Sequence, residues 1–310
     1  MLVVTALGGN ALLRRGEPAD VDHQRANIAA AVDALAHLAR DHRLVVTHGN
    51  GPQVGLLALQ SEAYPQVTPY PLDVLGAESE GMIGYLLEQG LGNRLPGRHT
   101  ATLLTQVVVD ARDPAFARPS KPVGPVYDEE TAARLARERR WTVAEDGASW
   151  RRVVASPQPR RIVELQTIRL LVDAGVLVVC VGGGGVPVRV DAHGAMHGVE
   201  AVIDKDRSAA LLAQELHADA LLLLTDVPNV ERDHGTDRAR PIGEASVGEL
   251  DPADFDEGSM RPKVEAACRF VTQTGKMAAI GALSDATAIL AGSAGTRIVA
   301  ERVKTDARKR

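Results

Sequence analysis

The stretch RLVVTHGNGPQVGLLALQSEA (residues 43–63) determines the class of fold. It opens with an apolar, β-branched run that predicts a buried strand, and it closes with the residue pattern of a helix. Between them lies a glycine turn, and Pro52 after it suits the first position of a helix. The stretch therefore predicts one strand–turn–helix unit of an α/β protein.

The same alternation continues along most of the chain. Near-continuous apolar strands separated by helices are typical of a parallel sheet that is covered on both faces. The expected strands are 2–7, 43–48, 100–109, 175–182, 218–227 and 277–283, and the expected helices are 23–42, 52–63, 207–216 and 260–275.

Residues 111–160 interrupt this alternation. They hold a proline-rich segment, a charged helical pattern and both tryptophans of the chain. Trp141 and Trp150 need apolar surroundings to pack against. The region is therefore predicted to be an inserted, protruding subdomain or lid rather than a linker.

The composition excludes several classes of function. The 310 residues carry a net charge of −5 without a basic block, which gives no reason to expect nucleic acid or a membrane surface as a partner. Two cysteines are too few for a disulfide framework or a zinc site. No apolar stretch is long enough to span a bilayer, and the N-terminus lacks the charged region of a signal peptide, so a cytoplasmic protein is expected.

Glycine turns follow three of the expected strands, at 8–10, 49–51 and 182–185. Ligands of parallel sheets bind beyond the carboxyl ends of the strands, where glycines and helix N-termini present N–H groups to anions. Phosphate binding is therefore favoured over the alternative that these are only tight turns. A P-loop pattern is absent, the glycine spacing does not fit a dinucleotide fingerprint, and no serine elbow, HExxH or Cys/His pattern occurs.

Lysine is rare in this chain, which has 29 arginines and six lysines. Phosphoryl transfer requires positive charge on the oxygens of the transferring group. Lys121, Lys205 and Lys263 lie in proline- or glycine-marked turns or at expected helix starts, so they are candidates for that task. The alternative of ordinary solvated lysines remains open for each of them.

Nine motifs in order along residues 3–299 resemble the carbamate kinase family of the amino-acid-kinase superfamily. The resemblance implies a three-layer α/β/α sandwich with a central, mostly parallel sheet. It also implies a carbamoyl-phosphate lobe at about 1–175, a nucleotide lobe at about 176–310, the protruding subdomain at 111–160, and a homodimer. The motifs are ALGGNAL (6–12), HGNGPQVG (48–55), LLTQVVVD (103–110), PSKPVGPVY (119–127), RRVVASPQP (151–159), GGGGVPV (182–188), GVEAVIDKD (198–206), ADALLLLTDV (218–227) and GSMRPKVEAA (258–267).

The resemblance also implies an activity and a set of site residues. The activity is reversible phosphoryl transfer between ATP and carbamate, run mainly to make ATP from carbamoyl phosphate and ADP, with Mg²⁺ held by the nucleotide phosphates. Arginine breakdown is one of several pathways that could supply the carbamoyl phosphate. Lys205 and Lys263 are expected to hold the transferring phosphoryl group, Asp206 to orient them, and Lys121 to reach in from the subdomain. The substrate turns are expected to use Gly9, Asn10, Gly49, Asn50 and Gly51, and the nucleotide site Thr225, Asp226 and Met260.

The chain departs from the family at Glu78 and Glu80, where a methionine and a glutamine are usual. Both carboxylates are expected to point outward as a solvated helix face, because an inward charge would oppose binding of a phosphoryl group. The departure keeps open an enzyme with altered acceptor specificity. A nucleotide-binding regulatory protein without turnover is disfavoured by the intact lysines. Asp206 is predicted to be the N-cap of its helix, and Asp204 has no predicted role beyond charge balance.

Overall fold

The computed structural model describes residues 1–13, 17–18, 20–64, 66–256 and 258–301, without the side chains of Asn10 and Ala11. Its centre is an eight-stranded sheet in which every neighbouring pair is parallel except β16 with β17. In spatial order its strands are β15 (Glu244–Ser246), β17 (Thr296–Val299), β16 (Met277–Ala282), β12 (Ala220–Thr225), β1 (Leu2–Leu7), β2 (Arg43–His48), β9 (Leu177–Cys180) and β3 (Thr100–Leu103).

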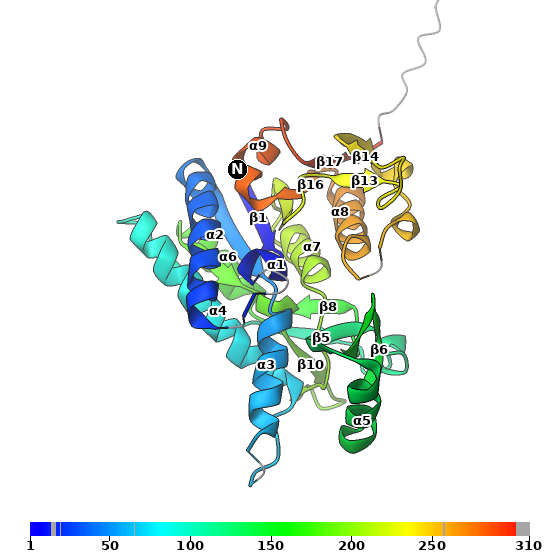
Figure 1. Ribbon diagram of the computed structural model, residues 1–310. Coiled ribbons are helices and arrows are strands. Elements are labelled where there is room, and N and C mark those ends of the chain that lie inside the picture. Colours follow the sequence, from blue (N-terminus) through cyan, green and yellow to red (C-terminus); the bar gives the residue numbers. More distant parts are fainter. Residues whose placement is uncertain (14–16, 19, 65, 257, 302–310) are drawn as a thin grey trace, which may run out of the picture.

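Helices cover both faces of this sheet, as Figure 1 shows for α2 and α4 on one side and α7 and α8 on the other. The fold is therefore a three-layer α/β/α sandwich, which confirms the predicted class. The helices are α1 (Gly9–Leu12), α2 (Val21–Asp41), α3 (Gly51–Glu62), α4 (Leu72–Arg94), α5 (Glu129–Arg139), α6 (Leu165–Asp173), α7 (Lys205–Glu215), α8 (Arg261–Thr274) and α9 (Ala286–Leu290).

The strand β12 illustrates why these residues form a central strand. Leu221 and Leu223 pack into the core on the side of α6, α7 and α8, whereas Leu222 and Leu224 pack into the core on the side of α2, α4 and α9. Successive side chains of a strand point to opposite faces. A continuous leucine run is therefore stable only where both faces are buried.

The described residues also form three smaller sheets. The four-stranded sheet has the order β11 (Met196–Gly198), β10 (Val186–Val190), β4 (Gln106–Val109) and β8 (Pro159–Ile162). A pair joins β13 (Val230–Arg232) to β14 (Arg240–Ile242). A three-stranded antiparallel sheet has the order β5 (Lys121–Tyr127), β7 (Ser149–Val154) and β6 (Thr142–Asp146).

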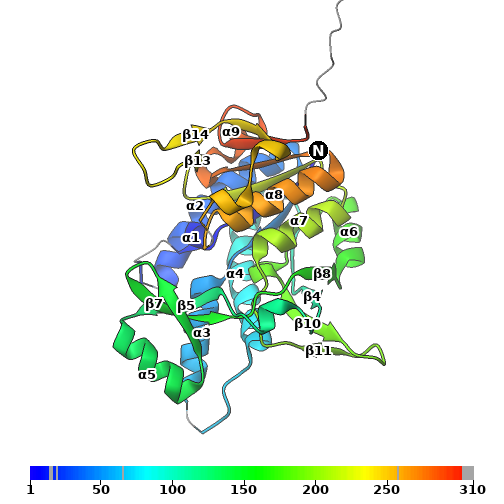
Figure 2. The ribbon, with the colours of Figure 1, turned by 90° about the vertical axis from the view of Figure 1, so that its right-hand side faces the viewer.

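The three-stranded sheet and α5 lie at the end of the molecule where α3 is found, opposite the end that holds α9 and β14 (Figure 2). Trp141 packs there against the guanidinium groups of Arg139 and Arg152, whose Cζ atoms are 5.1 and 4.7 Å from its ring centroid. Tyr127 also contacts this ring, with the two centroids 6.5 Å apart. These contacts supply the packing that the tryptophan requires.

The prediction of one strand at 100–109 is wrong. The chain leaves the main sheet after β3 and continues as β4 in the four-stranded sheet. Thr105 marks the break: its hydroxyl donates to the carbonyl of Leu103 at 2.8 Å and accepts the N–H of Val181 at 3.0 Å. Because the break depends on a partner 76 residues away, the local pattern of apolar residues does not reveal it.

Candidate active site

The glycine turns meet at one edge of the main sheet. The strands β12, β1, β2 and β9 are parallel neighbours, so their carboxyl ends point the same way. The turns at 8–9, 49–51 and 182–185 follow three of these strands, and Thr225 ends the fourth. The topology thus places the predicted anion turns side by side.

A cavity of about 220 Å³ lies between these turns. The structure therefore brings most of the predicted site residues to one place, although they come from distant parts of the chain. The predicted residues among its lining are Gly9, Gly49, Asn50, Gly51, Lys121, Lys205, Asp206, Thr225 and Lys263.

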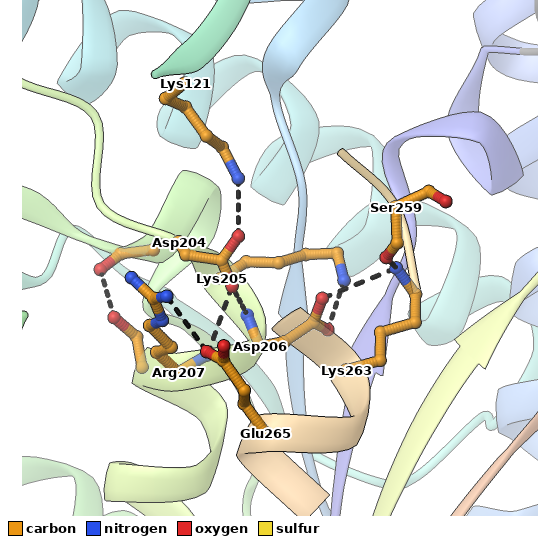
Figure 3. A network of polar contacts seen from close by, with 10 residues as sticks. Lys121, Asp204, Lys205, Asp206, Arg207, Ser259, Lys263 and Glu265 are labelled. Atoms are coloured by element: carbon orange, nitrogen blue, oxygen red, sulfur yellow. Dashed lines mark hydrogen bonds and ion pairs between the residues drawn. The ribbon is translucent and has the colours of Figure 1, made fainter. Parts of the chain in front are cut away.

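Asp206 joins two of the lysines (Figure 3). Its Oδ1 accepts the Nζ of Lys205 at 2.5 Å, and its Oδ2 lies 3.5 Å from the Nζ of Lys263. The Lys263 ammonium also donates to the carbonyl of Ser259 at 3.1 Å. One buried carboxylate therefore contacts two ammonium groups at the cavity.

Lys121 reaches the same cavity from the three-stranded sheet. Its Nζ lies 2.5 Å from the Oδ2 of Asp204, which is itself 5% exposed. The other oxygen of Asp204 accepts the backbone N–H groups of Asp206 and Arg207 and caps α7. The prediction that Asp206 is the N-cap is therefore wrong, because the extended backbone that a cap requires falls at Asp204.

The lysines and aspartates at the cavity stabilise one another's charged forms. Burial lowers the pKa of Lys205, and the nearby carboxylate of Asp206 opposes that effect. Burial also acts against the ammonium of Lys263, but Asp206 and Asp204 outweigh it and raise the pKa of Lys263. Burial opposes ionisation of Asp204 as well, yet the ammonium of Lys121 holds the pKa of this carboxyl well below its ordinary value. Three lysines and two aspartates thus leave an excess of positive charge at the cavity.

A larger cavity, of about 960 Å³, opens beside the first and shares Ser259 with it. It contains Met260, the residue predicted to line a nucleotide site. Asp226 lines neither cavity, but its Oδ1 accepts the hydroxyl of Thr225 at 3.0 Å. Asn10 belongs to α1, and its side chain lies outside the described residues.

The expectation for the two unusual carboxylates is right for one and wrong for the other. Glu78 is exposed, whereas Glu80 is 1% exposed and accepts backbone N–H groups from two turns. The side chain of Glu80 extends from α4 to Gly182, just beyond the end of β9. Neither side chain is part of the described lining of the anion cavity.

Two further residues at the cavity were not predicted. Arg151 lines it and donates from Nε to the carbonyl of Gly124 at 2.8 Å. Asp204 holds Lys121, as described above. The motif RRVVASPQP contains Arg151 and could have suggested it, but a chain with 29 arginines offers no local signal that singles one out.

The fold and the lysine-lined anion cavity are those of a phosphoryl-transfer protein. The model of the amino acid kinase family matches residues 1–281, and the chain belongs to that family. Its relatives place it among the carbamate kinases. The carbamate kinase of Haemophilus influenzae is 53% identical over 299 residues, covering 96% of each chain. That of Pyrococcus furiosus is 46% identical and covers 96% of this chain and 98% of its own.

Solved structures agree with these relatives. Carbamate kinase from Giardia lamblia bound to citric acid superposes with a TM-score of 0.91 at 41% identity, covering 97% of this chain and 98% of that one. The same enzyme bound to AMP-PNP superposes with a TM-score of 0.87 at 40% identity, with the same coverage. The similarity therefore spans nearly the whole fold, the site included.

Proposed function

We propose that this protein is a carbamate kinase that converts carbamoyl phosphate and ADP reversibly to carbamate and ATP, and that it works mainly to make ATP. The observation that carries the proposal is the convergence of Lys121, Lys205 and Lys263 on one glycine-walled cavity. Transfer of a phosphoryl group depends on positioning and on positive charge at the oxygens of that group. Carbamate is already an anionic oxygen nucleophile, so the reaction requires no strong general base.

Lys205 and Lys263 would bind the oxygens of the transferring group, with Asp206 holding both ammonium groups in place. An ammonium group that is already oriented stabilises developing charge without reorganisation during the reaction. The turns at Gly9, Asn10, Gly49, Asn50 and Gly51 would hold the rest of carbamoyl phosphate through backbone N–H groups. The first role is supported by the short distances to Asp206. The second is supported by the cavity that Gly9, Gly49, Asn50 and Gly51 line together with these lysines.

Lys121 would act from a lid formed by residues 111–160. Its ion pair with Asp204 joins the three-stranded sheet to the N-terminus of α7. On closure over carbamoyl phosphate, the ammonium group would move from Asp204 to the phosphoryl oxygens. Closure would also exclude water and so limit hydrolysis of the substrate.

The nucleotide would occupy the larger cavity at Met260 and reach toward Thr225, which lines the adjoining anion cavity, and toward its neighbour Asp226. The AMP-PNP complex of the Giardia lamblia enzyme supports a nucleotide site in this fold. The divalent metal, which we take to be Mg²⁺, would arrive with the nucleotide phosphates as part of the substrate. Asp204 and Asp206 are engaged by lysines, and the described residues hold no cluster of three or more His, Cys, Asp or Glu suited to a metal.

The lobe division at about residue 175, a homodimer, a cytoplasmic location and a role in arginine breakdown belong to the same proposal. They rest on the resemblance to the carbamate kinases. Among the described residues, no helix combines the length and apolar character that crossing a membrane requires.

A coupled assay of ATP formation from carbamoyl phosphate, ADP and Mg²⁺ tests the proposal. Turnover that requires all three components is expected. Binding of ADP without any turnover would overturn the proposal and favour a nucleotide-binding regulatory protein. Turnover only with another phosphorylated acid would indicate altered acceptor specificity.

A further inference from the structure

Two adjacent residues of α4 contact the turns that form the wall of the anion cavity. Ser79 is fully buried, and its Oγ accepts the Nδ2 of Asn50 at 2.7 Å. Glu80 is 1% exposed, and its Oε1 accepts the N–H of Gly182 at 2.7 Å. The Oε2 of Glu80 accepts the N–H of Thr105 at 3.2 Å. One turn of α4 therefore holds both the second and the third glycine turn.

The turn that Glu80 holds has an unfavourable backbone conformation. Val181 has a φ of +56°, which is rare for a β-branched residue, and Gly183 to Gly185 also have positive φ values. Strained backbone of this kind persists only where surrounding contacts determine it. Here the N–H of Val181 is held by Thr105 Oγ1 at 3.0 Å, and the next N–H is held by Glu80.

The same turn packs tightly against the wall of the cavity. A Cβ atom on Gly182 would lie 2.4 Å from His48 Nε2 and 2.7 Å from the Cγ of Glu80. A Cβ atom on Gly183 would lie 2.1 Å from the Nδ2 of Asn50. Gly183 and Asn50 both line the anion cavity. A shift of Gly182 would therefore move the lining directly.

We propose that Glu80 is a positioning residue for phosphoryl transfer, because it holds the turn at Gly182 in the conformation that sets Gly183 and Asn50 at the anion cavity. The inference rests on the proposed function. Glu80 acts through the turn, since its own side chain is not part of the described lining of the cavity.

The protonation state of Glu80 adds a consequence for the reaction. Burial raises the pKa of Glu80 to about 8 against the opposing hydrogen bonds from Gly182 and Thr105, and Glu164 raises it further. The other titratable groups nearby supply no positive charge: burial lowers the pKa of His48 to about 4 and raises that of the Cys180 thiol. At neutral pH Glu80 is therefore mostly uncharged. Above about pH 8 it places a negative charge behind the wall of an anion cavity, which raises the KM for carbamoyl phosphate.

Three variants and the wild type test this inference. Glu80→Ala removes both acceptors, whereas Glu80→Gln retains an acceptor oxygen for Gly182 and cannot ionise. Leu87→Ala removes a fully buried side chain of the same helix outside the site, so it measures the effect of destabilisation alone. The readouts are kcat and KM for carbamoyl phosphate from about pH 6 to pH 10, the Kd for ADP, and Tm.

We expect Glu80→Ala to lower kcat/KM for carbamoyl phosphate by roughly 10- to 100-fold, the effect of a misplacement of about 1 Å. Its ADP affinity should stay close to that of the wild type, because the turn at Gly182 lies at the anion cavity and not at the larger cavity proposed for the nucleotide. Glu80→Gln should recover most of the loss, and its KM should not rise above pH 8 as that of the wild type does.

Two results would overturn this inference and leave the proposed function standing. One is a Glu80→Ala enzyme that loses Tm as Leu87→Ala does and keeps its kcat/KM. The other is an alkaline rise in KM that is the same in Glu80→Gln and in the wild type, which decides the question even if Glu80→Ala does not fold. Absence of turnover in the wild type would overturn the proposed function and this inference with it.

Discussion

Because Glu80 is buried, the free energy of unfolding of this protein should depend on pH, and Glu80→Gln should remove this dependence. The pKa of Glu80 is raised from 4.5 to about 8 in the folded protein, mainly by burial. Between these values the folded protein retains a proton that the unfolded chain has released. Stability contributed by this group therefore falls as the pH rises from about 4.5 to about 8. Above about pH 8 the loss is complete.

The magnitude follows from the difference between the two pKa values, about 3.5. Each pKa unit corresponds to about 1.4 kcal/mol, so the loss reaches on the order of 4–5 kcal/mol across the interval. Glu80→Gln has no proton to release and does not show this loss. Its amide cannot accept both buried N–H groups, and the one left without an acceptor costs about 1–3 kcal/mol. We therefore expect the variant to be the less stable protein near pH 4.5 and clearly the more stable one at pH 8.

Urea unfolding at fixed protein concentration and a series of pH values measures this difference. His48 titrates in the opposite sense, because burial lowers its pKa from 6.5 to about 4, so its contribution is lost as the pH falls through that interval. It is present in both proteins and cancels in their difference. The exposed Glu78→Gln serves as the control and should follow the wild type. Two parallel curves for Glu80→Gln and the wild type would refute the reasoning.

Three further predictions concern the site and its lid. Lys205→Ala and Lys263→Ala should each lower kcat by on the order of 10²–10³ in the coupled assay, as expected when one oriented donor is lost; an effect on KM alone would contradict their assigned role. Lys121→Ala should lower turnover but leave the Kd for ADP nearly unchanged in a calorimetric titration, and a large loss of ADP binding would show that the lysine is misassigned. Gly55→Ala should destabilise the protein by about 1–3 kcal/mol, because its Cβ would lie 1.9 Å from the backbone of the facing strand β5. Gly92→Ala, on a helix surface with nothing within 4 Å, is the matched control, and equal unfolding curves for the two variants would contradict the predicted clash.

The agreement between sequence and structure is best where a signal is local. The strand 43–48, the glycine turn and the helix after it occur as predicted, with β2 at Arg43–His48 and α3 at Gly51–Glu62. Apolar runs, glycines and a proline at a helix start act within a few residues of one another. Because the predicted strands are parallel, their carboxyl ends lie at one edge of the sheet, and the glycine turns that follow them meet at that edge.

The errors occur where the outcome depends on distant partners. The break between β3 and β4 depends on Thr105 and Val181. The helix cap falls at Asp204 rather than Asp206, where the chain is also held by Lys121 from the three-stranded sheet. The local sequence is compatible with an unbroken strand at 100–109 and with an N-cap at either aspartate. The tertiary contacts therefore select the observed structure.

An α/β protein with glycine turns suited to anions, and a few lysines suited to a phosphoryl group, could be predicted from the sequence alone. Periodicity and turn chemistry are properties of neighbouring residues, and they are readable without the fold. The packing of distant elements was needed to show that Lys121, Lys205 and Lys263 share one cavity, and that Glu80 is buried behind it while Glu78 is exposed. Burial and convergence depend on how elements far apart in the chain pack together, and a carboxylate takes its charge state from that packing.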